Sequence, residues 1–554
     1  MSPSMSAAAH VGRLGALAVA LGVGAAIASG TAVAWADAPG DAGSSAHDTS
    51  ASASHSRAQR ASARPSTAAA SAAASKSASR AAAPAATATV SPSRVPRSAT
   101  AVASVPGTGV GGSPTTPATT PAEWALAASA RREFEPQPAT PAAAVVTSPT
   151  KLTSAPVGWV TGQANNAYPG ANWPQTNNTA SFNIWGTDVG VMWENGLTHN
   201  IQVAFGDTFS GPNQTGDWRS NVLLLSNNID LVHGLKLWQT GPAYQFIPSA
   251  PGALFPILNS EVTVIPSSAV YANDENYVNY FSVKSWDTPG RWTTNYSAIS
   301  QFVPGPNGGK WVLQNSTIRS AGWFRSSTPY VAGSQNFQQA AYVLQPADQV
   351  PDGGTQYVYA FGTPSGRAGS AFLSRVPADS VTDLKKYEYW DGTNWVANKP
   401  AVAVAILGDS TKSGGLFGFV KDIANNPKFF GGYFAGLPGA KTGGNVSEMS
   451  VQYNDYLDKY VVLYANGSNN VVLRTADTPE GPWSDPVTIA TSVQYPGLYA
   501  PMIHPWSGTG TLNSEADGSG TPDVSNLYWN MSIWGNYNVV LMKTDLTPLK
   551  PTVV

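Results

Sequence analysis

The chain of 554 residues contains no cysteine. This absence excludes disulfide bonds, a cysteine nucleophile, a thiolate-bound metal and a redox-active thiol pair. Histidine is also scarce, and three of the six histidines fall within the first 55 residues. The other three, His199, His233 and His504, have none of the spacings that are typical of zinc sites. We therefore expect neither a metal ion nor any other cofactor.

Charged residues are few, and the net charge is small as well. Charged residues make up only 12% of the sequence, and the formal net charge is −2. A near-neutral chain gives no reason to expect nucleic acid as a partner. Aromatic residues instead reach 10%, with 18 Trp and 21 Tyr. Sugar rings stack on aromatic faces, so this composition suits a carbohydrate-binding protein, although most of the aromatic residues are expected to fill a β-sheet core.

Long apolar runs are absent except for one, between Leu14 and Ala34. It is rich in Gly and Ala and ends at an Ala-Trp-Ala cleavage pattern, which predicts a secretory signal peptide over residues 1–36. Because no other run of that length occurs, we expect no stable membrane insertion after the signal is cleaved. The expected location is therefore secreted or associated with the cell wall.

Residues 37–150 are almost entirely Ala, Ser, Thr and Pro. Such a segment has too little apolar bulk to offset the entropy of ordering, so it is predicted to be a disordered, flexible linker. A weak hold on anionic wall polymers is the alternative to a simple solvated linker. The globular domain is expected to occupy residues 151–554.

In that domain a pattern of short strands repeats five times. Each unit has an apolar strand, a polar loop and a second apolar strand, and another short strand comes before them. The preceding strands are Asp188–Trp193, Glu261–Ile265, Gln338–Leu344, Glu448–Tyr453 and Tyr499–His504. Five such units with almost no helical periodicity predict an all-β fold, a five-bladed β-propeller. A two-sheet sandwich is the alternative, but about 400 residues is long for one.

The most informative stretch is 183–209, where two apolar runs flank a polar connection and predict a β-hairpin. Asp188 opens its first strand, and Asp207 closes its second. A hairpin that is symmetric about residues 197–198 would place the two aspartates opposite each other, with Cβ atoms about 4.5–5.5 Å apart. Carboxylates this close cannot both ionise easily, so one pKa should rise and the other stay low. Such a pair fits retaining glycoside hydrolysis, which needs carboxyl groups about 5 Å apart.

Two other interpretations of these aspartates remain open. Asp beside Gly is a common turn cap, and a register slip of one residue would turn the two side chains to opposite faces. In a propeller, however, the first strands of the blades line the central channel. Their starts would bring Glu261, Glu448 and Tyr499 to the aspartates as substrate-binding residues. His504 is a further candidate for hydrogen-bonding a sugar hydroxyl, and Trp218 is a candidate stacking platform for sugar rings.

Between about residues 158 and 546 the sequence resembles the endo-D-arabinanase family of glycoside hydrolases, formerly a domain of unknown function in actinobacteria. The matching segments are Gly186-Thr-Asp188-Val-Gly190, Phe205-Gly-Asp207-Thr-Phe209, Trp218-Arg-Ser-Asn221, Trp292-Thr-Thr-Asn-Tyr-Ser297, Phe361-Gly-Thr-Pro-Ser-Gly-Arg367, Glu448-Met-Ser-Val-Gln-Tyr-Asn454 and Tyr537-Asn-Val-Val-Leu-Met-Lys-Thr-Asp545. The resemblance implies a propeller that cleaves internal α-D-arabinofuranosidic bonds with retention. Its implied substrate is the D-arabinan of mycobacterial-type arabinogalactan and lipoarabinomannan, and its two catalytic aspartates fall on Asp188 and Asp207.

By analogy with propeller glycosidases, whose nucleophile tends to start the innermost strand of the first blade, Asp188 is assigned as the nucleophile and Asp207 as the acid/base. The rival hypothesis is a non-catalytic propeller that binds cell-wall glycan as a lectin or adhesin. Both hypotheses need aromatic side chains at the channel mouth, but only the enzyme needs both aspartates. In either case we expect a monomer whose partner is a cell-wall polysaccharide. The role of the insertion at 396–444 is left open.

Overall fold

The computed structural model describes residues 151–163, 172–249, 261–288, 291–306, 308–515 and 518–550. The predicted signal peptide (1–36) and the predicted linker (37–150) lie outside the described residues. Strands dominate the described part of the chain, so the predicted all-β class is confirmed. Within that part, no helix combines the length and the apolar character that crossing a bilayer requires.

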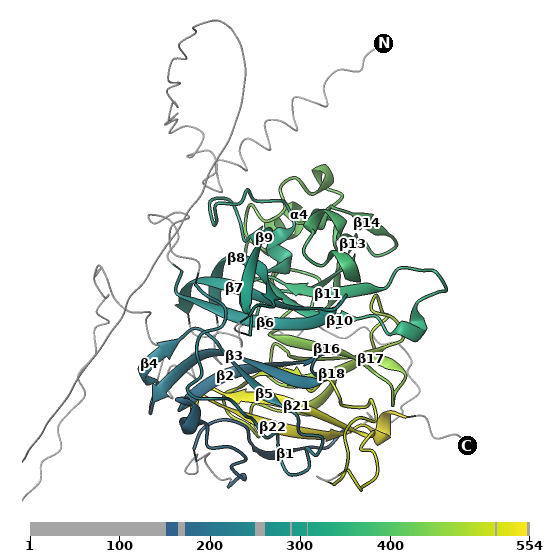
Figure 1. The fold of residues 1–554 in the computed structure, drawn as a ribbon. Coiled ribbons are helices and arrows are strands. Elements are labelled where there is room, and N and C mark those ends of the chain that lie inside the picture. Colours follow the sequence, from purple (N-terminus) through teal and green to yellow (C-terminus); the bar gives the residue numbers. More distant parts are fainter. Residues whose placement is uncertain are drawn as a thin grey trace, which may run out of the picture. The chain divides into compact units, whose positions relative to one another are not determined.

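Five antiparallel sheets make up this part of the chain (Figure 1). We call them blades 1 to 5 in chain order. Blade 1 contains β2 (Gly186–Asn195), β3 (Asn200–Gly211), β4 (Thr215–Arg219) and β5 (Val222–Ser226). Blade 2 contains β6 (Thr263–Ala272), β7 (Glu275–Thr288), β8 (Arg291–Val303) and β9 (Lys310–Ser320).

Blade 3 is the largest of the five sheets, with β10 (Gln339–Leu344), β11 (Tyr357–Thr363), β12 (Ala371–Pro377), β13 (Glu388–Trp390), β14 (Trp395–Ala397) and β15 (Ala405–Leu407). Blade 4 contains β16 (Met449–Asn454), β17 (Lys459–Ala465), β18 (Val471–Ala476) and β19 (Val487–Ala490). Blade 5 contains β20 (Leu498–Ile503), β21 (Asn526–Ile533) and β22 (Asn538–Asp545), together with β1 (Ser154–Trp159).

The first strands of the blades form a closed ring. In this ring β2 contacts β6, β6 contacts β10, β10 contacts β16, β16 contacts β20, and β20 returns to β2. Closure of five sheets around one axis is a five-bladed β-propeller, as the sequence predicts, and it leaves only short sheet edges open.

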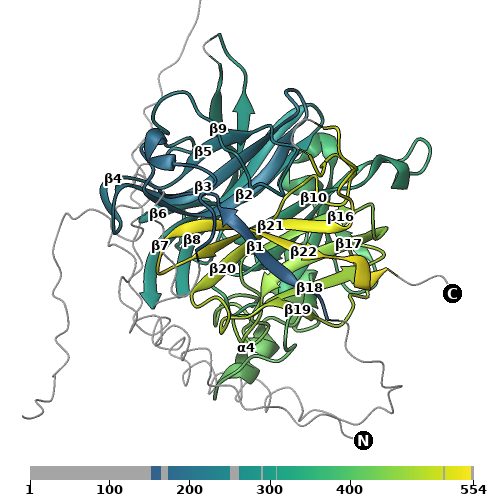
Figure 2. The ribbon, with the colours of Figure 1, turned by 90° about the horizontal axis from the view of Figure 1, so that it is seen from below.

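Strand β1 completes blade 5 from the other end of the chain. It pairs with β22, with Ser154 opposite Thr544 and Trp159 opposite Val540 (Figure 2). The sequence analysis missed this strand because Pro156 and Gly158 break its alternating pattern. Proline is tolerated there because β1 is an edge strand, where a backbone N–H is not needed on the outer side.

The core lies between neighbouring blades. One cluster joins blades 1 and 2 and includes Trp193, Ile265 and Trp311. Another joins blades 4 and 5 and includes Leu473 and Trp529. Full burial of one such side chain contributes about 1.5–3 kcal/mol. Most aromatic residues therefore have the structural role that the composition predicts.

The segment after β14 departs from the blade pattern. It contains β15, the turn Phe430–Gly432 and α4 (Gly418–Ala424), which is the only α-helix in the described residues. A single helical turn, Leu384–Lys386, leads into β13.

Candidate active site

The hairpin of β2 and β3 has the predicted symmetry. It pairs Gly186 with Phe209 and Asn195 with Asn200, so its turn is centred at residues 197–198. The ladder is regular except near the aspartates, where its register shifts on both sides of Val189, so Asp188 and Asp207 are not a regular cross-strand pair. Bulges bend a strand and redirect its side chains, and they are common next to active sites.

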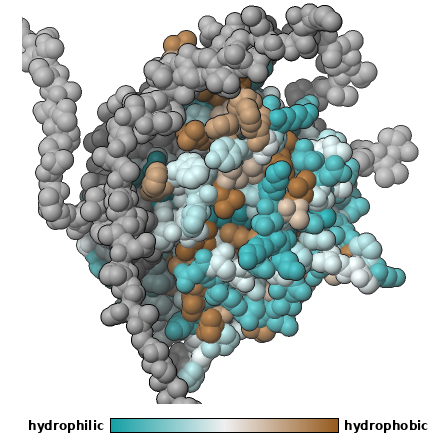
Figure 3. All heavy atoms as spheres, turned by 90° about the horizontal axis from the view of Figure 1, so that it is seen from above, coloured by the Kyte–Doolittle hydropathy of each residue, from teal (hydrophilic) through white to brown (hydrophobic). Residues whose placement is uncertain are grey.

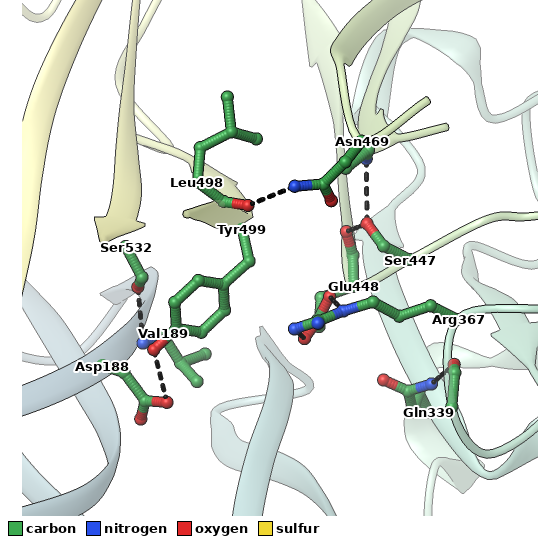
Figure 4. A network of polar contacts seen from close by, with 12 residues as sticks. Asp188, Val189, Gln339, Arg367, Ser447, Glu448, Asn469, Leu498, Tyr499 and Ser532 are labelled. Atoms are coloured by element: carbon green, nitrogen blue, oxygen red, sulfur yellow. Dashed lines mark hydrogen bonds and ion pairs between the residues drawn. The ribbon is translucent and has the colours of Figure 1, made fainter. Parts of the chain in front are cut away.

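The bulge gives the backbone beside Asp188 an unusual conformation. Val189 has φ +68° and Gly190 has φ +75°. Left-handed backbone is rare for a β-branched residue and costs on the order of 1–3 kcal/mol. Here the Val189 N–H donates to Ser532 Oγ of blade 5 at 2.9 Å, and this hydrogen bond fixes the strained residue (Figure 4). The strain is thus localised next to the carboxyl group that the sequence singles out.

Asp188 is buried and contacts blade 5. Its Oδ2 accepts a hydrogen bond of 2.9 Å from the hydroxyl of Tyr499, the second residue of β20. Its Oδ1 lies over Gly206, where an added Cβ would be only 2.4 Å away. Gly206 is therefore required at this position because the carboxyl group of Asp188 occupies the space of its missing side chain.

Asp207 is buried and contacts blade 2. Its Oδ1 accepts hydrogen bonds from Trp218 Nε1 at 3.0 Å and from Thr263 Oγ1 at 2.5 Å. Trp218 lies on β4, and Thr263 is the first residue of β6. The predicted stacking platform Trp218 thus has a different contact from the one expected, since its indole N–H binds the carboxyl group of Asp207.

Burial controls the charge of both aspartates. Burial, and after it the neighbouring Asp207, raise the pKa of Asp188 to about 8. Burial likewise raises the pKa of Asp207 to about 7, against the opposing effect of its hydrogen bonds from Thr263 and Trp218. The prediction that one pKa would stay low is wrong, because desolvation acts on both carboxyl groups, whereas the sequence argument considered only their mutual repulsion.

Two tyrosines border the pair. Burial and the nearby Asp188 raise the pKa of the Tyr499 phenol well above its usual value. The pKa of Tyr537 rises in the same way, through burial and the charges of both aspartates. Both phenols therefore stay protonated at neutral pH and are available as hydrogen-bond donors. Trp534 packs against both rings, with centroid distances of 6.1 Å to Tyr499 and 5.9 Å to Tyr537.

A partly buried ion pair lies on the other side of Tyr499. Arg367 donates to Glu448 from Nε at 3.0 Å and from Nη2 at 2.7 Å. The guanidinium also lies over the rings of Trp292, at 5.2 Å, and Tyr499, at 5.3 Å. Figure 4 shows Tyr499 between Asp188 and this pair. The positive charge of Arg367 lowers the pKa of Asp188, whereas Glu448 raises it, so the pair adjusts the charge of the site.

The loop that carries Arg367 is fixed by blade 3. Gln339, the first residue of β10, donates from Nε2 to the carbonyl oxygens of Pro364 and Gly366 at 3.0 Å each. Starts of innermost strands from several blades thus meet at one end of the ring, which we call the entrance end. The structure brings together Asp188, Asp207, Glu448 and Tyr499 there.

Two other sequence candidates have different positions. Glu261 lies two residues before β6 and accepts hydrogen bonds from Ser282 at 2.7 Å and Tyr296 at 3.3 Å, both in blade 2. His504 follows the last residue of β20, five residues beyond Tyr499, which is about 16 Å along an extended strand. The prediction that His504 contacts a sugar is therefore wrong, because this side chain is buried away from the entrance end. Burial also lowers its pKa to about 3.

Several site residues were missed by the sequence analysis. Thr263 comes from blade 2 and contacts Asp207, Ser532 comes from blade 5 and contacts the Val189 N–H, and Arg367 comes from blade 3 and contacts the Tyr499 ring. These contacts form only after the ring has closed. Arg367 and Tyr537 do occur in the motifs that resemble the endo-D-arabinanases, and that was the available signal. Among the described residues, no group of three or more His, Cys, Asp or Glu side chains could hold a metal ion.

The fold and the site define a five-bladed propeller with a buried pair of carboxyl groups at its entrance end. The profile of a family described as "Domain of unknown function (DUF4185)" matches residues 174–416 and 435–543. The chain belongs to this family. The match agrees with the resemblance noted from the motifs, which was to a former domain of unknown function.

Curated relatives are fungal. The chain is 27% identical over 362 residues to the notoamide biosynthesis cluster protein J' of Aspergillus versicolor, a match that covers 59% of this chain and 79% of the relative. It is 24% identical over 348 residues to the notoamide biosynthesis cluster protein J of Aspergillus sp. (strain MF297-2), covering 58% and 77%.

Solved structures with a similar arrangement include an α-L-arabinanase mutant of Cellvibrio cellulosa. It is 13% identical, the match covers 65% of this chain and 90% of that chain, and the TM-score is 0.36. Another is an exo-β-1,3-galactanase of Phanerochaete chrysosporium, with 11% identity, coverage of 70% and 66%, and a TM-score of 0.37. These scores are too low to support an argument, so the architecture rests on the five sheets themselves.

Proposed function

We propose that the protein is a retaining, endo-acting glycoside hydrolase. The observation that carries the proposal is the juxtaposition of Asp188 and Asp207, two buried carboxyl groups on paired strands at the entrance end. Double displacement needs one carboxylate to attack the anomeric carbon and one carboxylic acid to protonate the leaving oxygen. Raised pKa values in a buried pair favour a state in which one group keeps its proton and the other is ionised.

The hydrogen bonds favour a division of roles opposite to the one assigned from sequence. Asp207 accepts two hydrogen bonds on one oxygen, and these stabilise its anion. Asp188 has the higher pKa and is the group that keeps the proton. We therefore assign Asp207 as the nucleophile. Asp188 is the acid that protonates the leaving oxygen and then the base that takes a proton from water.

The substrate class is proposed from the motif resemblance. It is D-arabinan with internal α-D-arabinofuranosidic bonds, as in the arabinogalactan and lipoarabinomannan of mycobacterial-type walls. Trp534, which is partly exposed, supplies aromatic surface next to Tyr499 at the entrance end. A secreted or wall-associated monomer, which the sequence predicts, would meet this polymer outside the cell.

The test is incubation of the chain without residues 1–36, the form that signal cleavage would leave, with purified arabinogalactan. Release of a ladder of oligoarabinosides supports the endo-hydrolase, and NMR of the first products reports whether the anomeric configuration is retained. Retained binding without any release would favour the glycan-binding propeller, and inverted first products would exclude double displacement.

Substitution of Gly206 by alanine is expected to reduce kcat by about 10²-fold, because the new Cβ would lie 2.4 Å from Asp188 Oδ1 and would displace the carboxyl group. The matched control is Gly305→Ala, whose Cβ would meet its nearest neighbour at an ordinary 3.6 Å. Steady-state kinetics on oligoarabinosides measures both variants. A wild-type kcat for Gly206→Ala would contradict the assigned position of Asp188.

The pH dependence should differ from that of ordinary carboxyl groups. Hydrolysis requires protonated Asp188 and ionised Asp207, so kcat/KM should fall as the pH rises above about 8 and as it falls below about 7. The optimum is expected between these values, near neutrality, and not near pH 4, where unperturbed aspartates titrate. Rates measured between about pH 3 and about pH 10 test this, and a maximum below about pH 5 would contradict it.

A further inference from the structure

A separate apolar surface lies at the entrance end, beside the carboxyl site. Two segments form it, residues 321–333 between β9 and β10 and residues 408–446 between β15 and β16; we call them together the apolar lobe. The second segment returns to the ring next to the site, since the Val446 N–H donates to the Gly369 carbonyl at 2.9 Å and Glu448 follows two residues later.

Helix α4 is apolar on two opposite sides. Gly418, Val420 and Ala424 are buried against the rest of the protein. On the other side Phe419 and Ile423, one turn apart, are 57% and 45% exposed. A surface helix normally presents a polar face to water, so the outer side of α4 is an apolar face that no described residue covers.

The rest of the lobe has the same character. Of the seventeen large hydrophobic side chains that are exposed among the described residues, ten belong to the lobe. Phe324, Leu416 and Tyr433 are the most exposed of these, at 79%, 85% and 70%. Figure 3 views the molecule from the side on which α4 lies and shows brown, apolar side chains at its surface. Concentrated exposure of this kind marks an interaction site.

Hydrogen bonds and ring contacts hold the backbone of the lobe in place. The Tyr330 hydroxyl of its first segment donates to the Ala435 carbonyl of its second at 2.7 Å. Gln335 Nε2 donates to Asn425 Oδ1, at the end of α4, at 3.1 Å. Phe429 and Phe430 also pack ring against ring, with centroids 4.9 Å apart. These contacts fix the backbone while the outer side chains stay exposed.

Part of the lobe also falls outside the match to the family. The match to the family profile breaks off at residue 416 and resumes at residue 435, so residues 417–434, with α4 and the aromatic turn, fall in the gap. Neither the closed ring of strands nor the hydrogen bonds of Asp188 and Asp207 involve this segment. Its exposed apolar side chains therefore have a purpose of their own.

The chemistry of the lobe favours lipid over sugar. Of the ten exposed apolar side chains in the lobe six are aromatic, but four, including Leu416 and Ile423, are aliphatic and offer no flat face for a sugar ring. Lys412 and Lys428 are exposed and pair with no carboxylate among the described residues, whereas Asp422 is engaged within the lobe by the Ser413 N–H and Lys441. Exposed apolar groups flanked by lysines are typical of segments that lie in the interface of an anionic bilayer.

We propose that the apolar lobe binds the surface of a bilayer that contains anionic lipid. The phenylalanine and leucine side chains enter the headgroup region, and the lysines contact lipid phosphates. Because the lobe lies at the entrance end, this binding would direct the carboxyl site toward glycan chains attached to that bilayer. This last consequence rests on the proposed function, but the lipid binding does not.

The experiment is co-sedimentation with vesicles of mixed phosphatidylcholine and phosphatidylglycerol, and with vesicles of phosphatidylcholine alone, using the chain without residues 1–36. The test variant combines Leu416→Gln, Phe417→Gln and Phe430→Gln. The matched control combines Tyr244→Gln, Val303→Gln and Val493→Gln, which are exposed apolar residues outside the lobe. All six side chains are exposed, so both variants should fold.

We expect the unmodified chain and the control to bind the anionic vesicles, and the lobe variant to bind at least about tenfold more weakly. A chain carrying Lys412→Gln and Lys428→Gln should lose its preference for anionic vesicles. No vesicle binding by the unmodified chain, or equal binding by the lobe variant, would overturn the proposal. Self-association of the chain through the lobe would also overturn it. So would a lobe that binds soluble oligoarabinosides and not vesicles, which would show as a loss of oligoarabinoside affinity in the lobe variant.

The two proposals can fail separately. Vesicle binding is measured without any hydrolysis, so it remains informative if the protein is not an enzyme. Conversely, the lobe variant should hydrolyse short soluble oligoarabinosides at the unmodified rate, because its substitutions do not contact the carboxyl site.

Discussion

Replacement of Asp188 or Asp207 by alanine is expected to reduce kcat/KM on D-arabinan by at least about 10³-fold. Such a loss corresponds to about 4 kcal/mol of transition-state stabilisation. The physical reason is that the nucleophile and the acid each act on the glycosidic bond, and no other described carboxyl group accepts hydrogen bonds from the same donors. Steady-state kinetics measures the loss, and a variant at the unmodified rate would show that the site is wrongly assigned.

Azide distinguishes the two roles. If Asp207 is the nucleophile, azide attacks the substrate directly in Asp207→Ala and gives a glycosyl azide of inverted configuration. In Asp188→Ala, azide instead attacks the glycosyl-enzyme and gives a product of retained configuration. NMR of the two products decides the matter, and the opposite pattern would restore the assignment made from the sequence.

The same two residues have a predictable effect on stability. Their folded-state pKa values are raised above those of the unfolded chain, so the stability they contribute is lost as the pH rises through about 7 to 8. Asp188→Asn and Asp207→Asn remove this loss and should raise Tm by several degrees at about pH 9, with little effect at about pH 5. The exposed Asp485→Asn serves as the control and should leave Tm unchanged.

The second large effect concerns the ion pair between Arg367 and Glu448. Glu448→Gln leaves the guanidinium, which is 16% exposed, without a counter-charge and is expected to destabilise the protein by about 3 kcal/mol. It also removes a negative charge that raises the pKa of Asp188, so the alkaline limb of the pH–rate profile should move to lower pH. Thermal unfolding and kcat/KM across pH measure the two effects.

A second Arg–Glu pair provides the control. Arg375 and Glu388, in blade 3, also approach to 2.7 Å. Their side chains are 20% and 29% exposed, whereas those of Arg367 and Glu448 are 16% and 13% exposed. Glu388→Gln should cost less stability and leave the pH–rate profile in place. An unchanged profile in Glu448→Gln would show that the pair of Arg367 and Glu448 has only a structural role.

Much of the fold could be predicted because the repeating unit is local. A short strand, an apolar strand, a loop and another apolar strand recur in the sequence, and the ring of β2, β6, β10, β16 and β20 follows from their number. Strand β1 could not be found this way, because its partner β22 lies at the far end of the chain and its own sequence has no alternation. Edge strands lack the two-sided burial that produces a strong pattern.

The site was predictable only in part. That Asp188 and Asp207 lie at the same end of paired strands follows from the symmetry of one hairpin, which is a local property, but the register shift between Thr187 and Val189 could not be predicted. Their environment does not, because Thr263 and Tyr499 arrive from other blades, and burial of the pair depends on the closed ring. That missing burial is why the sequence argument expected one pKa to stay low, whereas burial raises both.

The pairing of β1 with β22 has a consequence for how the protein is made. Ser154 and Thr544, which share a hydrogen bond of 2.7 Å between their hydroxyl groups, are 390 positions apart. A ribosome therefore delivers the first partner long before the second, and the ring cannot be sealed until translation is almost complete. Until then the unsealed blades expose open edges, so a chaperone that shields nascent chains should increase the yield of this protein markedly.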